Sequence, residues 1–395
     1  MGTLPAINLL LNKKIAIVGG GPGGLTLARL LQLKGAEVKV YERDYSQASR
    51  VQGAIVDLHF ESGLKAIEAA GLMEEFKANY MAGADIFRVV DPQANILLDE
   101  SNQSAEAKFG DESFRPEIDR GALRDILIAG LLPRTVVWDS QFVNMLQVDN
   151  EWELEFRNGT TATADIVIGS DGYRSQIRDY LTDVKALYSG AMIIQGEIEN
   201  PETACPEMYK LINQANLMAM GAGATIAAQP RGDGGLTFYA ASLYPENWER
   251  TSGIDFNDPK EVRAYLVDHF ADWSPVFFTL FEACTHFVLR PLNYFPLEER
   301  WETKNNLTLL GDAAHLMPPN GEGVNLAMLD ALDLSESLTN AEFKDLKDAI
   351  SAYENSMFER SASLCRETIE GIKDFASPTD ESVQEFIKIF TGDKT

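Results

Sequence analysis

Short apolar runs rich in β-branched residues recur along the chain and predict buried strands. Residues 15–18, Ile-Ala-Ile-Val, form the first run and fit a strand buried on both faces of a parallel sheet. After Gly24, leucines and alanines on one helical face predict a helix that ends at Gly35. Residues 38–41 predict a second strand, so this segment forms one βαβ unit of about 30 residues.

The pattern changes twice further along the chain. Residues 166–169 and 307–310 repeat the buried-strand pattern, whereas residues 190–289 carry strand-like segments separated by Gly and Pro clusters. The last part of the chain is polar, acidic and helical in pattern. We therefore expect an α/β protein with one domain from residues 1–180 and 290–335, an inserted β-rich domain from 181–289, and a C-terminal helical segment, 336–395, that bridges them.

A glycine-rich motif lies between the first strand and the first helix. Residues 19–24, Gly-Gly-Gly-Pro-Gly-Gly, satisfy the pattern G-x-G-x-x-G in the context that the pattern requires. Gly19 permits a tight turn, Gly21 lets the backbone approach a pyrophosphate, and Gly24 allows close packing of helix and strand. Glu42, at the end of the second strand, is placed to accept hydrogen bonds from a ribose diol. This combination favours dinucleotide binding over a purely structural glycine turn.

A second motif, far along the chain, favours FAD over NAD as the dinucleotide. Asp312 follows the strand-like run 307–310, so a long cofactor is needed to reach both this carboxylate and the first motif. Asp312 is suited to hold ribityl hydroxyls, and the turn of Gly321, Gly323, Val324 and Asn325 is suited to direct backbone N–H groups at a flavin ring. The alternative is an ordinary strand–turn–helix connection with an aspartate cap. On the FAD interpretation, the first domain is a Rossmann-like FAD-binding domain and the inserted domain binds substrate.

Composition and charge disfavour several classes of function. The chain has 395 residues, with 34 basic and 60 acidic side chains and a formal net charge of −26, which disfavours nucleic acid and anionic membranes as partners. The three cysteines are far apart and the four histidines lack metal-site spacing, so we expect neither disulfides nor a metal. No apolar run is long enough to span a membrane and no signal segment is evident, so we expect a soluble, cytoplasmic protein.

A third motif, Asp171-Gly172-Tyr173-Arg174-Ser175, is weak alone because Asp-Gly is also a common turn. With all three motifs in order, the chain resembles the class A flavin monooxygenases, the family that includes para-hydroxybenzoate hydroxylase. It is most similar to the TetX-type tetracycline-inactivating monooxygenases, over residues 40–44, 56–59, 116–120 and 311–319. The resemblance implies that NADPH reduces bound FAD, oxygen adds to the flavin, and the flavin hydroperoxide delivers one oxygen atom to a substrate carbon.

The resemblance also assigns cofactor roles to individual residues. It places Glu42 at the adenosine ribose and Arg43 near the adenine, and it matches Asp57, Arg120 and Asp312 to positions that contact FAD. Asp171 belongs to the third cofactor motif, and Arg50 matches a position assigned to NADPH. Without the resemblance, Arg43 and Arg50 are also explicable as surface charges. The sequence has no second G-x-G-x-x-G, as expected for a family without a separate NADPH module.

The predicted substrate side is less uniform. Gln195 matches a substrate-contacting glutamine, whereas Asn216 and Thr237 stand where the tetracycline enzymes have an arginine and a histidine. The loop after Pro319 is one residue shorter than in those enzymes. Apolar residues that either wall the ligand or belong to the core are Met218, Met220, Phe238 and Met317. No catalytic base is assigned; His59 and His315 are candidates only by location, and a structural role is favoured for both.

We therefore expect a monomeric enzyme that uses O2 and NADPH to hydroxylate a small aromatic or polycyclic phenol or enol, with a tetracycline as one candidate. An aromatic hydroxylase of unrelated small-molecule metabolism is an alternative. A flavin reductase without oxygen insertion keeps the same fold with different chemistry. A flavin-binding partner protein without enzyme activity is the third reading.

Overall fold

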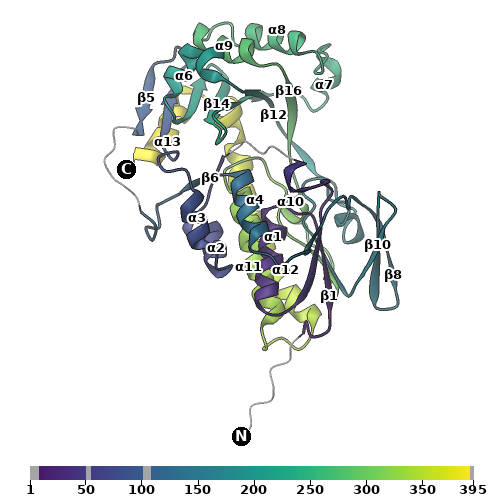
Figure 1. Cartoon of the computed structure of the whole chain (residues 1–395). Helices are drawn as coiled ribbons and strands as arrows, with labels where there is room; N and C mark the ends of the chain where they lie inside the picture. The colour runs from purple at the N-terminus through teal and green to yellow at the C-terminus, as the bar shows by residue number, and fades with distance from the viewer. Residues whose placement is uncertain (1–8, 50–54, 101–107, 392–395) are drawn as a thin grey trace.

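The apolar runs form a five-stranded parallel sheet in the computed structural model of Figure 1, which describes residues 9–49, 55–100 and 108–391. In spatial order its strands are β17 (Leu307–Leu309), β11 (Ile166–Gly169), β1 (Lys14–Val18), β2 (Glu37–Tyr41) and β7 (Val136–Val137). Strand β1 pairs with β2 and β11, and β11 pairs with β17. Because strands from both ends of the chain complete this sheet, the predicted Rossmann-like α/β architecture is confirmed.

Three helices lie beside this sheet, and the first of them packs against the other two. They are α1 (Pro22–Leu33), α4 (Arg120–Ala129) and α11 (Gly323–Thr339). A Cβ at Gly23 would lie 2.7 Å from Leu310 Cδ1 and 2.8 Å from the Ala327 carbonyl oxygen, so α1 and α11 approach this closely only at a glycine. An antiparallel sheet of β8 (Phe142–Val148), β9 (Glu151–Phe156) and β10 (Thr161–Ala164) adds apolar side chains to the same core.

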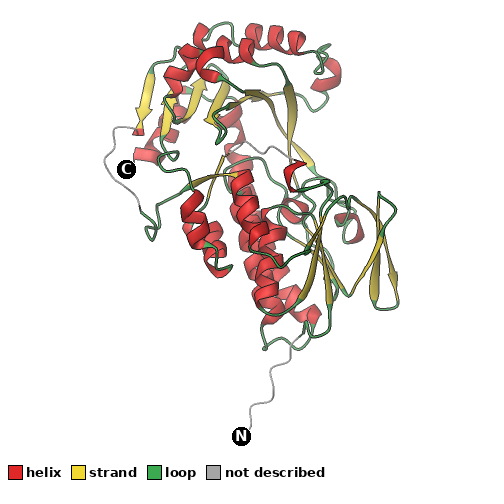
Figure 2. Ribbon diagram, viewed as in Figure 1, coloured by secondary structure: helices red, strands yellow, loops and turns green. Residues whose placement is uncertain are grey.

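A seven-stranded mixed sheet forms the second lobe (Figure 2). Its spatial order is β16 (Phe287–Tyr294), β12 (Leu187–Ile198), β15 (Leu236–Leu243), β14 (Ala224–Pro230), β13 (Asn216–Gly221), β4 (Phe87–Val90) and β5 (Ile96–Asp99). Strands β4 and β5 come from the stretch 1–180 that the sequence analysis grouped with the first domain. A second hydrophobic core joins one face of this sheet to α6 (Pro206–Ile212), α8 (Pro259–His269) and α9 (Pro275–Ala283).

Two elements connect the lobes. The antiparallel pair β3 (Ile55–Asp57) and β6 (Glu117–Asp119) lies between them in Figure 1. Helix α12 (Leu346–Ala376) has 31 residues and is therefore about 46 Å long. Its Tyr353 and Met357 belong to the first core, whereas Ile372 and Ala376 pack with residues of β12, β15 and β16. One helix thus packs against both lobes.

The remaining elements are short or terminal. They are η1 (Gln47–Ser49), the π-helix η2 (Phe60–Leu64), α2 (Lys65–Ala69), α3 (Met73–Asn79), η4 (Arg178–Tyr180), α5 (Pro201–Ala204), α7 (Trp248–Thr251), α10 (Asp312–His315) and α13 (Asp380–Thr391). Within the described ranges, no helix combines the length and the apolar character needed to cross a membrane.

Candidate functional site

The glycine turn after β1 leaves room for a ligand on one side. Gly19 has a φ of 109°, and a Cβ there would lie 2.6 Å from the Ser170 carbonyl carbon. A Cβ at Gly24 would lie 2.5 Å from Ser170 Oγ, so both positions require glycine for packing. A Cβ at Gly21, in contrast, would have no protein atom within 4 Å. This open side is at the N-terminus of α1, where unpaired N–H groups favour an anion such as a pyrophosphate.

Glu42 follows β2, and its buried carboxylate fixes the glycine turn. Its Oε2 accepts a 2.7 Å hydrogen bond from the Gly20 N–H, and its Oε1 accepts a 3.0 Å bond from the Asp44 N–H. Arg124 pairs with Asp44 at 3.1 Å and lies 4.0 Å from Glu42. Sequence reasoning missed Arg124, although it lies one helical turn beyond Arg120 on α4.

Asp312 and two arginines are available to a ligand on the open side of the sheet. Asp312 is exposed, but many protein atoms lie around its carboxylate. The loss of hydration that they cause raises the pKa of Asp312, whereas the charges of His315 and Arg120 lower it. Arg120 therefore lies within electrostatic reach of Asp312. Arg43 and Arg120 are exposed, and neither forms a hydrogen bond or ion pair with another residue that the structure describes. Arg50, predicted at the NADPH site, lies outside the described residues.

Asp171 is used inside its own turn. Its Oδ1 accepts a 2.6 Å hydrogen bond from Ser175 Oγ, and its Oδ2 accepts a 2.9 Å bond from the Gln176 N–H. Burial raises the pKa of Asp171, while these hydrogen bonds lower it. The carboxylate therefore shapes the loop after β11. Both of its oxygens accept hydrogen bonds from this loop, so Asp171 is less available to a ligand than Asp312 is.

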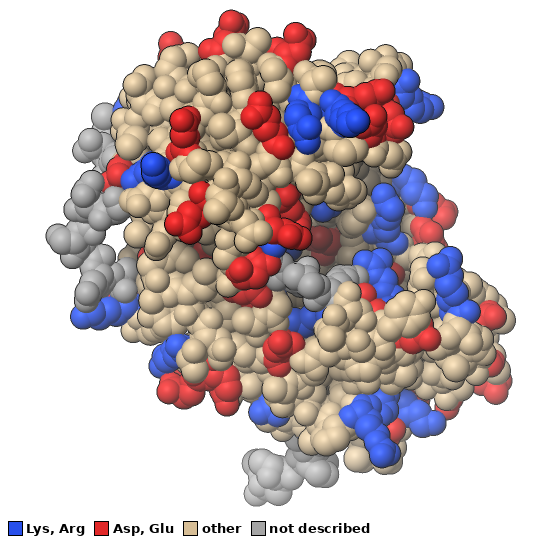
Figure 3. Space-filling view, turned by 45° about the horizontal axis from the view of Figure 1, so that its top comes forward, with Lys and Arg blue, Asp and Glu red and all other residues tan. Residues whose placement is uncertain are grey.

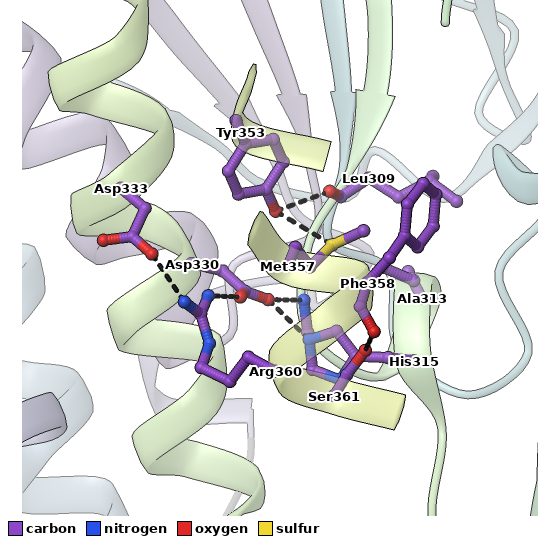
Figure 4. A network of polar contacts seen from close by, with 12 residues as sticks. Leu309, Ala313, His315, Asp330, Asp333, Tyr353, Met357, Phe358, Arg360 and Ser361 are labelled. Carbon is purple, nitrogen blue, oxygen red and sulfur yellow. Dashed lines mark hydrogen bonds and ion pairs between the residues drawn. The ribbon is translucent and has the colours of Figure 1, made fainter. Parts of the chain in front are cut away.

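A buried ion-pair network holds the turn that presents Asp312 (Figure 4). Asp330 Oδ2 accepts a 2.9 Å hydrogen bond from the Gly311 N–H and lies 2.6 Å from His315 Nε2, while Oδ1 pairs with Arg360 at 2.7 Å. Burial raises the pKa of Asp330, but the charges of His315 and Arg360 lower it overall. His315 is committed to this network, which agrees with the structural role favoured for it.

The turn before α11 is open at one residue and anchored at another. Gly321 has a φ of 87°, and a Cβ at Gly323 would have no protein atom within 4 Å, so the helix N-terminus is accessible to a ligand. Asn325 is fully buried: its Oδ1 accepts a 2.9 Å hydrogen bond from the His59 N–H, and its Nδ2 donates a 3.0 Å bond to the Asp57 carbonyl. Asn325 thus positions the turn rather than facing a ligand, and Val324 is half-buried beside it.

His59 clamps this turn to the β3 segment. Its Nε2 lies 2.7 Å from Asp57 Oδ2 and its Nδ1 lies 3.1 Å from Glu322 Oε1. Burial lowers the pKa of His59, but hydrogen bonds and charge from Asp57 and Glu322 raise it overall to about 9. His59 is therefore cationic at neutral pH and is a poor candidate for a general base. Sequence reasoning missed Glu322, because no local spacing connects it to His59.

Strand register brings part of the predicted substrate set to one face of the seven-stranded sheet. Gln195 pairs with Tyr239, Tyr239 pairs with Ala227, and Ala227 pairs with Met218, so these side chains share a face. Phe238 does not join them. It is fully buried on the opposite face, which the helices cover. Side chains alternate along a strand, so the neighbouring Tyr239, which sequence reasoning missed, takes the place expected for Phe238.

The two positions that differ from the tetracycline enzymes are both buried. Asn216 Nδ2 donates a 2.8 Å hydrogen bond to Glu117 Oε1, whereas Asn216 Oδ1 has no partner among the described residues. Thr237 Oγ1 is likewise buried and without a partner in the described part of the chain.

The other predicted substrate residues differ in their surroundings. Gln195 Oε1 accepts a 2.5 Å hydrogen bond from Arg290 Nε. Pro319 is exposed on the loop before α11, and Met220 is buried.

Several predicted cofactor residues have open space or unpaired charge beside them, as binding of an FAD would require. Gly21 and Gly323 have open space at two helix N-termini, and Asp312 is exposed after β17. Arg43 and Arg120 are exposed positive charges in a chain of net charge −26. On the face drawn in Figure 3, acidic and basic side chains are interspersed rather than gathered in one field. No group of three or more His, Cys, Asp or Glu within the described ranges has a metal-binding arrangement.

Comparison with known proteins gives matches over most of the chain. The family model described as FAD binding domain matches residues 12–195 and 297–366. Monooxygenase asqM of Emericella nidulans is 29% identical over 88% of this chain and 92% of its own length.

Solved structures share the fold across nearly the whole chain. Klebsiella pneumoniae HpxO, solved with FAD and uric acid, is 19% identical, with a TM-score of 0.74 over 98% of this chain and 95% of that chain. The tetracycline destructase Tet(55) is 20% identical, with a TM-score of 0.74 over 96% of this chain and 95% of its own. At these identities, the likeness concerns the fold alone.

Proposed function

Because the chain belongs to the FAD binding domain family and is an FAD-dependent monooxygenase of class A, we propose that it uses NADPH and O2 to hydroxylate an aromatic or polycyclic phenol or enol. One observation carries the proposal. The glycine turn after β1 and the Asp312 turn after β17 open at the same edge of one parallel sheet.

The flavin, when bound and reduced, supplies the redox chemistry and the activated oxygen. The residues that would hold it are the glycine turn and Arg120 for the phosphates, Asp312 for the ribityl chain, and the start of α11 for the ring. The sheet face of Gln195, Tyr239 and Met218 would orient the substrate. The two lobes keep bulk water from the reacting atoms.

The substrate is proposed as a phenol or enol because such compounds carry an electron-rich carbon. A tetracycline stays one candidate, since Tet(55) shares the fold. Asn216 and Thr237 leave unpartnered oxygen atoms on the sheet, so the preferred substrate has polar groups on its buried side. NADPH is proposed from the resemblance that also placed Arg50.

The test is oxygen uptake by the FAD-loaded protein with NADPH, across a panel of phenols, uric acid and tetracycline. We expect one compound to stimulate uptake and to yield a product heavier by one oxygen atom, with label incorporated from isotopically labelled oxygen gas. Asp312→Ala is the matched control and should lose bound FAD and uptake together. Product of unchanged mass would instead support a flavin reductase, and a protein whose flavin NADPH never reduces would support a flavin-binding partner.

A further inference from the structure

The pair β3–β6 carries carboxylates on the face directed at the seven-stranded sheet. Asp57 and Glu117 are direct partners in this antiparallel pair. Ile118 points the opposite way, into the first core, so Glu117 and Asp119 point toward the second lobe. A Cβ at Gly232 in the β14–β15 hairpin would lie 3.1 Å from Asp119 Cβ, which confirms that this face meets the sheet.

Glu117 lies between a predicted cofactor residue and a predicted substrate residue. On one side is Asp57, matched to an FAD contact, and on the other is Asn216, matched to a substrate contact and hydrogen-bonded to Glu117 Oε1 at 2.8 Å. Glu117 is 8% exposed, and no Lys or Arg pairs with it in the described part of the chain. Its Oε2 forms no hydrogen bond with a described residue, and Asn216 Oδ1 is also without a partner among the described residues.

The charges around Glu117 favour its neutral form. Burial raises the pKa of Glu117 to about 8, and the charges of Asp57 and Asp85 act in the same direction. The hydrogen bond from Asn216 and the charge of His59 oppose this shift, but His59 is already paired with Asp57 and Glu322. Asp119 and Arg120 follow Glu117 in the chain, and Asn216 brings no charge from β13. A neutral carboxyl group is a hydrogen-bond donor, whereas a carboxylate only accepts.

We propose that Glu117 is a substrate-contacting residue whose neutral carboxyl group donates a hydrogen bond to a carbonyl or enolate oxygen of the substrate, with Asn216 Oδ1 accepting from a neighbouring hydroxyl. The inference rests on the proposed function for the identity of the site. It narrows the substrate to compounds with an oxygen acceptor next to a hydroxyl group. Glu117 therefore selects the substrate, while the flavin performs the oxygen transfer.

The test measures binding without turnover, so it does not depend on the outcome of the oxygen-uptake assay. The probes are ortho-hydroxyacetophenone and ortho-ethylphenol, which have similar size and differ in the carbonyl acceptor. Each is titrated into the FAD-loaded protein without NADPH, and binding is read from the flavin absorption. We expect the wild type to bind the carbonyl probe about tenfold more tightly at neutral pH and to lose that preference as Glu117 ionises.

Variants separate a contact from a structural role. Glu117→Gln keeps a donor that cannot ionise, so its preference for the carbonyl probe should be independent of pH, whereas Glu117→Ala should show none. The preference for the carbonyl probe has a midpoint in its pH dependence, set by the ionisation of Glu117. Asp85→Asn removes an exposed negative charge that raises the pKa of Glu117, so it should move this midpoint to lower pH. Asn216→Ala removes a hydrogen bond that lowers the same pKa, so it should move the midpoint to higher pH. An unchanged preference in Glu117→Ala, or a midpoint that neither Asp85→Asn nor Glu117→Gln alters, would overturn the proposal.

Discussion

Two glycines of one turn serve different purposes, and single substitutions separate them. Gly24→Ala places a methyl group against the Gly19 carbonyl and Ser170 Oγ, so we expect the free energy of unfolding of the FAD-free protein to fall by about 1–3 kcal/mol. Gly21→Ala meets no protein atom, so the same quantity should change by less than about 0.5 kcal/mol. The affinity of the Gly21→Ala protein for FAD should nevertheless fall about tenfold, because the methyl group blocks the approach of the pyrophosphate.

Denaturant unfolding measures the first quantity, and quenching of FAD fluorescence on binding measures the second. The pair is its own control, since each variant adds one methyl group to the same turn. A Gly21→Ala protein that binds FAD as tightly as the wild type would place the pyrophosphate elsewhere.

His59 gives the folded state a defined pH dependence. Its pKa is raised to about 9 by Asp57 and Glu322, so the folded state holds a proton that the unfolded chain releases near its ordinary value of 6.5. This contribution to stability is complete below about pH 6.5 and is lost as the pH rises through about 9. We expect His59→Gln to lower the free energy of unfolding by about 2–3 kcal/mol at the acidic end of this window and by little above it.

Unfolding of the FAD-free protein by urea, repeated across the window, checks this prediction. His286→Gln is the control because His286 is exposed and its ring forms no hydrogen bond to a described residue; it should change stability by less than about 0.5 kcal/mol. A difference between wild type and His59→Gln that stays constant with pH would mean that His59 is neutral in its clamp.

At the scale of elements, the sequence allowed the long apolar strands to be placed but not always their faces to be assigned. Residues 236–243 are apolar at most positions, so the pattern identifies a strand without showing which side faces the ligand. The pairing of Gln195 with Tyr239 shows that these two side chains share one face, whereas Phe238 points into the second core. The glycine motif and Glu42 were predictable because their spacing is local, whereas the contact of Glu117 with Asn216 joins residues far apart in sequence.

The short strands illustrate the same limit. Strands β4 and β5 interrupt the first domain's part of the sequence yet extend the seven-stranded sheet, where β4 runs parallel to β13. Strand β6 has only three residues, too few for a periodic signal, although it carries the carboxylate nearest to Asn216. Such elements are specified by partners on other parts of the chain and not by their own composition.

At the scale of the whole molecule, α12 ties the cofactor turn to the substrate sheet. In the first half of α12, the Tyr353 hydroxyl donates a 2.9 Å hydrogen bond to the Leu309 carbonyl, and Arg360 forms an ion pair with the buried Asp330 (Figure 4). At its end, Thr225 Oγ1 donates a 2.5 Å bond to the Phe375 carbonyl, so the helix also holds β14. A substitution at Arg360 should therefore weaken the hydrogen bond that holds the Gly311 turn, in addition to its effect on α12 itself.

Arg360→Met tests this coupling because it leaves the fully buried Asp330 without one of its two cations. Removing one partner of such a pair is costly, so we expect the free energy of unfolding to fall by about 2–4 kcal/mol. FAD affinity should fall as well, since Asp330 also holds the Gly311 N–H beside Asp312. Arg366→Met is the matched control on the same helix: its partner Glu298 is exposed, so a change below about 0.5 kcal/mol and unaltered FAD binding are expected. Equal effects of the two substitutions, measured by urea unfolding and FAD titration, would show that α12 contributes packing alone.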